Sequence, residues 1–142
     1  GYAGLSQKRV DLLIQENIPV NVVIIYLGTN DCKVGTDVST FKRNYKQMIN
    51  MMYETLGDVD IIVCTLGAST FSYTSCYDLR IEYNNVLREL STELNFGLAL
   101  IDEVITEENK EQYMANMLHP NKAGMEAIYG AVMSALDQYI GA

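Results

Sequence analysis

The stretch VNVVIIYLGTND, residues 20–31, decides the fold class of this chain. Its first eight residues are nearly all apolar and rich in β-branched side chains, which is typical of a strand covered on both faces. The run stops at Gly28, and Thr29, Asn30 and Asp31 follow. All four residues are favoured in turns, so the stretch by itself is either an ordinary strand end or the rim of a site.

Similar apolar runs and amphipathic segments alternate along the rest of the sequence. The runs predict strands at 20–27, 59–66 and 96–101. Spacings of three and four predict helices at 5–17, 38–56, 77–95 and 107–114, and a last helix that Asn121 caps and that ends at Ile140. This alternation predicts α/β units around a parallel sheet, with ligands bound beyond the carboxyl ends of the strands. Because residues 28–31 follow the most apolar strand, we expect them to project from a central position.

Length and composition indicate one domain over residues 1–142 and argue against several partners. The chain has only two prolines and a net charge of −8. Such a charge disfavours nucleic acid as a partner, and no apolar run is long enough for a membrane span. The cysteines, carboxylates and single histidine do not fall at metal-ligand spacing, so we expect no metal and no cofactor.

Asn30 and His119 are the residues with the clearest chemical potential. A side-chain amide held just past a buried strand is a donor that can stabilise an oxyanion. His119 is the only histidine, and it lies in a loop immediately before Pro120, where it suits a general base. Non-catalytic alternatives stay open for both residues. GTND is also compatible with a simple turn, and a lone histidine is also compatible with a purely structural role. The hydroxyl-rich loop 65–77 is either a substrate contact or a polar surface loop.

Two blocks, VVIIYLGTND (22–31) and HPNKAG (119–124), together resemble the SGNH, or GDSL-type, esterase/lipase family. GYAGLS (1–6) resembles that family's second block. The resemblance implies a flavodoxin-like three-layer α/β/α fold and ester hydrolysis through an acyl-enzyme. It also implies that a small-molecule or carbohydrate ester is the substrate.

By matching position, the resemblance gives each of these residues a role. It makes Asn30 and Gly4 donors to the oxyanion and His119 the base that activates a serine. Asp31 and Gly28 become supporting residues that shape the loop.

The sequence departs from the family at two places. The nucleophilic serine belongs to a Gly-Asp-Ser block on the family's first strand, and no such block occurs here. We therefore expect a chain that lacks its N-terminal part, in which the nucleophile is missing and Ser6 and Ser69 do not replace it. The family's histidine block commonly reads Asp-x-x-His, whereas Asn116 stands at the Asp position here. Natural variation, an inactivating substitution and orientation by a backbone carbonyl are all open explanations.

Loss of the first strand has a structural consequence, since that strand lies in the middle of a flavodoxin-like sheet. Its absence would leave an open edge along residues 20–27. We expect the chain to form a homodimer through this edge, to pair with the missing N-terminal segment, or to be poorly stable.

Two functions are compatible with the sequence. The first is an SGNH-type acyl- or acetyl-esterase in the parent protein, with this chain inactive alone. The second is a non-catalytic SGNH-like domain that binds a carbohydrate or a protein. A phosphoacceptor receiver domain is disfavoured, because only Asp31 and Asp102 stand at strand ends.

Overall fold

The computed structural model describes residues 2–69 and 74–140. Helices and short strands alternate along the chain, as the sequence predicts. The elements are α1 (Tyr2–Gln15), β1 (Val22–Ile25), α2 (Thr29–Val34), α3 (Val38–Leu56), β2 (Asp60–Cys64), α4 (Thr74–Leu94), β3 (Gly97–Ala99), α5 (Ile101–Val104), α6 (Lys110–Tyr113) and α7 (Lys122–Tyr139).

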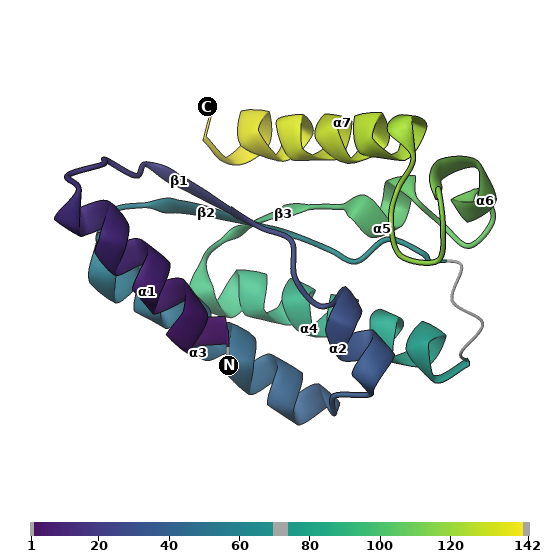
Figure 1. Ribbon diagram of the computed structural model, residues 1–142, viewed down its shortest axis with the longest axis horizontal. Helices are drawn as coiled ribbons and strands as arrows, with labels where there is room; N and C mark the ends of the chain where they lie inside the picture. Colours follow the sequence, from purple (N-terminus) through teal and green to yellow (C-terminus); the bar gives the residue numbers. More distant parts are fainter. Residues whose placement is uncertain (1, 70–73, 141–142) are drawn as a thin grey trace.

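The three strands form one parallel sheet in the order β1-β2-β3, so β2 is the central strand. Val63 of β2 pairs with Ile25 on one side and with Leu98 on the other. Helices α1, α3 and α4 lie below the sheet in Figure 1, while α7 lies above it with α5 and α6 beside it. The predicted three-layer α/β/α fold with a parallel sheet is confirmed.

The larger hydrophobic core lies between the sheet and the α3–α4 layer. Phe41, Tyr45 and Tyr83 have no exposed surface, and the rings of Phe41 and Tyr83 stack with centroids 3.9 Å apart. Helix α3 presents Phe41, Tyr45, Met48 and Met52 to this core at spacings of four and three, whereas Tyr83 comes from α4. Asp37 caps it by accepting a hydrogen bond from the Thr40 N–H at 2.8 Å. The core therefore fixes where β1 ends and α2 begins.

A second core fills the space between the sheet and α7. Ile62 and Cys64 of β2 pack there with Ala99 of β3 and Ala135 of α7. Helix α7 begins after Asn121, whose side chain accepts from the Gly124 N–H. The predicted cap and helix are confirmed, and this packing fixes the position of the loop that precedes α7.

Strand β1 is an edge of the sheet, and part of its apolar surface is open. Ile24, Tyr26 and Leu27 keep 48%, 43% and 40% of their surfaces exposed. A groove of about 260 Å³ runs beside this edge between β1 and α1, and Arg9 and Val10 are among its lining residues. The open edge expected along residues 20–27 is therefore present.

Several details differ from the sequence expectations. The segment 28–31 projects from the edge strand rather than from the centre of the sheet, because β2 takes the central position. Thr29, Asn30 and Asp31 belong to the short helix α2 and not to a simple turn. Strand β3 ends at Ala99, since Ile101 already starts α5.

Candidate active site

A cavity of about 210 Å³ opens where the chain leaves the carboxyl ends of β1 and β2. Segments that are far apart in the sequence line this cavity together. Its lining residues are Tyr26, Thr29, Asn30, Gly67, Ala68, Ser69, Ile105, Met114, Leu118, His119, Pro120 and Ile128. The structure therefore brings Asn30 and His119, separated by 89 positions in the printed sequence, to one cavity.

Gly28 places Asn30 at the cavity. Its φ of 134° belongs to a region that favours glycine. A Cβ at this position would lie 3.0 Å from Leu66 Cδ1 and 3.1 Å from Phe41 Cε2, so the core also leaves little room. The chain turns at Gly28 and continues directly into α2, whose first turn carries Asn30. Asn30 is exposed, so its amide is available to a ligand.

The loop between α6 and α7 holds His119. Met114 and Pro120 form an antiparallel bridge, and the Ala115 N–H donates to the His119 carbonyl at 2.8 Å. The loop closes tightly on α7, because a Cβ at Gly124 would lie only 2.2 Å from the Tyr113 carbonyl oxygen. The glycine of the HPNKAG block is therefore required by close packing beside the histidine.

Asn116 orients the His119 ring. Its Oδ1 lies 3.1 Å from Nδ1 of His119 and accepts from the backbone N–H groups of Leu118 and His119, each at 2.9 Å. An oxygen can only accept, so this contact assigns the proton to Nδ1. The lone pair is then on Nε2, which is the arrangement a general base needs. Asn116, at the position where the family commonly has Asp, thus keeps the contact with His119 Nδ1 but carries no negative charge.

The other candidate residues lie at or beyond the margin of the cavity. Gly4 is exposed in the first turn of α1, where N–H groups lack partners within the helix, and it does not line the cavity. Asp31 accepts a hydrogen bond from the Tyr2 hydroxyl, which links the beginning of α1 to α2. Asn30 also lines a neighbouring hollow of about 310 Å³ that reaches Tyr2. Gly4 is therefore two residues from Tyr2, which lines this hollow. It does not line the cavity that Asn30 and His119 share.

The environment of Cys32 disfavours the nucleophilic thiolate form. It is buried in α2, and burial raises the pKa of its thiol to about 12, with the neighbouring Cys76 adding to the shift. The thiol is therefore protonated at neutral pH, whereas the thiolate is the nucleophile. Cys64 is buried too, and burial raises its pKa to about 11.

Sequence reasoning missed most of the apolar lining of the cavity. Ile105, Met114, Leu118 and Ile128 come from four separate places in the chain. Their spacing resembles that of core residues, so no pattern distinguishes them. The loop 65–77 does reach the cavity through residues 67–69, and its residues 70–73 lie outside the described residues.

In the described ranges 2–69 and 74–140, no group of three or more His, Cys, Asp or Glu side chains could hold a metal ion. No helix in these ranges has the length and apolar character needed to cross a membrane.

The layered fold, with a cavity at the carboxyl ends of parallel strands, defines an α/β protein of the hydrolase-like kind. The chain belongs to the GDSL-like Lipase/Acylhydrolase family, whose sequence profile matches residues 2–127. The family expected from the sequence is thereby confirmed. Among curated protein sequences, none matched the chain significantly.

Solved structures share this fold at low identity. A member of the lipolytic G-D-S-L family from Veillonella parvula superposes with a TM-score of 0.77 at 14% identity, covering 93% of this chain and 73% of that protein. The acetylxylan esterase Axe2 from Geobacillus stearothermophilus gives 0.67 at 17%, covering 92% and 67%. The acetyl xylan esterase AlAXEase gives 0.70 at 18%, covering 92% and 75%. The chain thus spans about two thirds to three quarters of these proteins.

Proposed function

We propose that this chain carries the oxyanion-binding residue and the general base of a serine ester hydrolase. The observation that carries the proposal is the single cavity shared by Asn30 and His119, with Asn116 holding the Nδ1 side of the ring. Membership of the GDSL-like family supports ester hydrolysis as the reaction.

The proposed reaction begins when a serine hydroxyl attacks the ester carbonyl carbon. His119 Nε2 takes the serine proton, and the carbonyl oxygen becomes an oxyanion. The Asn30 side-chain amide donates to that oxyanion. The Gly4 backbone N–H, which does not line the cavity, is a second donor only on the strength of the family resemblance. Collapse breaks the bond to the alcohol, which leaves with the proton from His119. Water then attacks the acyl-enzyme, and the same base and donors release the acid.

The serine is proposed to come from outside this sequence, on a strand that pairs with the open edge of β1. Ile24, Tyr26 and Leu27 offer exposed apolar surface along that edge. Tyr26 lines both the edge groove and the cavity, so the two are neighbours on the molecule. A strand parallel to β1 would therefore end next to Asn30. An N-terminal segment of the same protein is the proposed source, and a second copy of the chain is the alternative occupant.

The proposed substrate is a small-molecule or carbohydrate ester with a short acyl group. The cavity of about 210 Å³ has room for a small group, and its apolar lining suits an acyl chain. Two of the structures with this fold are acetylxylan esterases by description, which supports an acetylated carbohydrate as a candidate.

Hydrolysis of p-nitrophenyl acetate by the 142-residue chain tests where the nucleophile is. We expect the wild-type chain, His119→Ala and Ser69→Ala to give the same background rate. Ser69 is the matched control because it lines the same cavity. Enzyme-like turnover that disappears in His119→Ala would place a nucleophile within this chain and contradict the missing-serine proposal. Loss in Ser69→Ala as well would identify that nucleophile.

A second candidate function is a non-catalytic SGNH-like domain that binds a carbohydrate or a protein. Asn116 favours it, because a neutral amide replaces the carboxylate expected beside the base. In a serine protease, the Asp-to-Asn change at the equivalent position lowers turnover about 10⁴-fold. The coding sequence upstream of Gly1 distinguishes the two. A Gly-Asp-Ser block there supports the hydrolase, and a longer chain without one supports the binding domain.

A further inference from the structure

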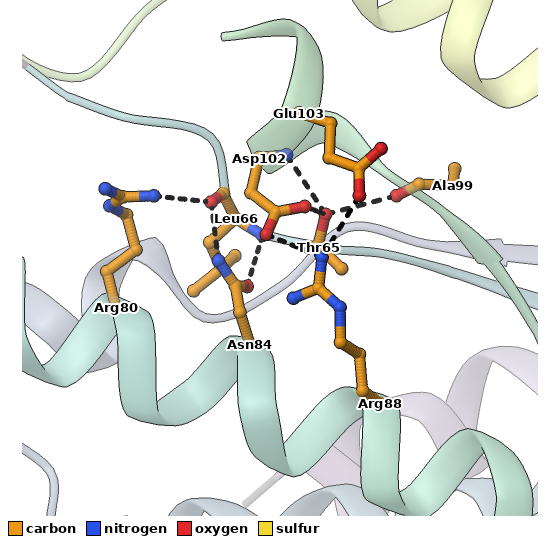
Figure 2. A network of polar contacts seen from close by, with 8 residues as sticks. All are labelled: Thr65, Leu66, Arg80, Asn84, Arg88, Ala99, Asp102 and Glu103. Carbon is orange, nitrogen blue, oxygen red and sulfur yellow. Dashed lines mark hydrogen bonds and ion pairs between the residues drawn. The ribbon is translucent and has the colours of Figure 1, made fainter. Parts of the chain in front are cut away.

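Leu66 lies where β2 leaves the sheet, and its backbone needs partners there. The pairing of β1 with β2 ends at Ile25 and Val63, yet Leu66 is only 1% exposed. Buried N–H and C=O groups without partners are costly. Asn84 of α4 supplies both partners, as Figure 2 shows. The Leu66 N–H donates to Asn84 Oδ1 at 2.7 Å, and Asn84 Nδ2 donates to the Leu66 carbonyl at 2.9 Å.

Asn84 is itself fixed by burial and by its neighbours on α4. It is 3% exposed, and Arg80 and Arg88 flank it at intervals of four on the same helix face. Arg80 Nη1 donates to the Leu66 carbonyl at 3.3 Å. Arg88 pairs with Asp102, just after β3, at 2.8 Å. Figure 2 shows this row of side chains joining α4 to the ends of β2 and β3.

Leu66 contacts the candidate active site in two ways. Its side chain packs on Gly28, because a Cβ there would lie 3.0 Å from Leu66 Cδ1 and 3.3 Å from Cδ2. Gly28 is two residues before Asn30. The backbone of Leu66 continues into Gly67, Ala68 and Ser69, which line the cavity. A displacement of Leu66 would therefore move both the Asn30 loop and the part of the cavity wall formed by residues 67–69.

We propose that Asn84 is a positioning residue for the Asn30 site, an inference that rests on the proposed function for its catalytic meaning. Asn84 does not line the cavity. It acts through Leu66. The fixed backbone of Leu66 holds its side chain against Gly28, and the position of Gly28 determines where the Asn30 amide points. Asparagine suits this task because its side chain offers an acceptor and a donor together, which alanine, leucine and an ionised aspartate do not.

The test compares two variants of the 142-residue chain by ¹H–¹⁵N NMR. Asn84→Ala removes the partner of Leu66. Val86→Ala is the control, because Val86 is on the same helix, is 6% exposed and also loses core packing. In Asn84→Ala we expect shifted signals for the Gly28 amide and the Asn30 side-chain amide. We also expect hydrogen exchange at the Leu66 N–H to become about tenfold faster or more, as loss of a buried hydrogen bond implies.

Val86→Ala is expected to lower the urea midpoint while leaving the Gly28 and Asn30 signals in place. Unchanged signals in Asn84→Ala, or equal shifts in both variants, would overturn the proposal. If Asn84→Ala does not fold, hydrogen exchange in the wild-type chain tests the proposal instead. Slow exchange of the Asn84 side-chain amide supports the proposal, and exchange as fast as that of the exposed Asn50 overturns it. These NMR signals do not depend on esterase activity. They therefore test the positioning role of Asn84 even if the chain proves not to be part of a hydrolase.

Discussion

At the scale of single residues, the candidate site depends on neutral amides. Asn30 brings an amide to the cavity, and Asn116 brings an amide oxygen to the imidazole of His119. Three N–H groups converge on Asn116 Oδ1. That convergence would also suit a carboxylate, so the surroundings of position 116 are compatible with the Asp that the family commonly has there.

Asn116→Asp tests this view directly. A carboxylate about 3 Å from Nδ1 favours the charged imidazolium, so the His119 titration midpoint should rise. Because His119 is exposed, solvent screening limits the size of this rise. His119 is the only histidine, so one NMR signal reports the result. Asn21→Asp, at the amino end of β1, is the control with the same charge change, and an equal rise in both variants would contradict the direct contact.

At the scale of elements, close packing at α7 holds the His119 loop in place. The first turn of α7 touches the end of α6, and Gly124 is the point of contact with the Tyr113 carbonyl. Asn121 caps the same turn. The histidine loop is therefore bounded by two helix ends that are fixed to one another.

Gly124→Ala should damage this contact. The new Cβ would lie 2.2 Å from a backbone oxygen, so the helix or the loop must shift. We expect the free energy of unfolding, measured in urea, to fall by about 1–3 kcal/mol. Gly130→Ala is the matched control on the same helix, since a Cβ there meets nothing within 4 Å. It should be neutral or stabilising by up to about 1 kcal/mol. A loss of equal size in both variants would show that the contact at Gly124 is unimportant.

The helix N-cap at Asp37 gives the fold a pH dependence at this scale. Hydrogen bonds from Ser39 and Thr40 hold the pKa of this carboxyl below its usual value. The lowered pKa means that the stabilisation is present above the unfolded pKa and is lost as pH falls through the folded pKa. Asp37→Asn keeps a capping oxygen, so we expect the wild type to lose its advantage over the variant on acidification. A constant difference in urea midpoint from pH 7 to pH 3 would rule out this contribution.

At the scale of the whole molecule, the sheet has one open apolar edge. Strand β1 has no neighbour on its outer side among the described residues, and Ile24, Tyr26 and Leu27 are partly exposed there. An open edge of this kind favours pairing with another strand. Tyr26, next to this edge, also lines the cavity.

We expect the 142-residue chain to self-associate through this edge or to be poorly stable. Size-exclusion chromatography with light scattering measures the association. Ile24→Lys places a charge on the exposed edge and should shift the population toward monomer. Lys33→Glu, on exposed α2 surface, serves as a control for charge alone. A stable wild-type monomer would contradict this expectation.

Much of this architecture follows from the sequence, and the remainder depends on tertiary contacts. Helix α3 was predicted with its observed bounds, because its apolar residues repeat at helical spacing. Helix α1 was expected at 5–17 and is observed at Tyr2–Gln15, where Val10 is its buried residue. Helix α2 was missed, because GTND favours a turn locally and only packing against Leu66 and Phe41 shows why the chain bends at Gly28.

The candidate site was predictable only where its residues are chemically distinctive. Asn30 and His119 were named from the sequence, and the structure brings them to one cavity. Asn84 was not named, because a polar residue on an amphipathic helix looks like surface, and its burial follows from the path of β2. The roles of Gly4 and Asp31 stay predictions.

The most direct test of the central claim is hydrolysis of p-nitrophenyl acetate by the chain extended through its upstream reading frame. If Asn30 binds the oxyanion, Asn30→Ala should lower kcat by about 10²–10³, and His119→Ala should abolish turnover above background. Asn50→Ala, an exposed asparagine on α3, should leave kcat unchanged. An active extended enzyme in which Asn30→Ala retains wild-type kcat would contradict the claim that Asn30 and His119 form one ester-hydrolysing site.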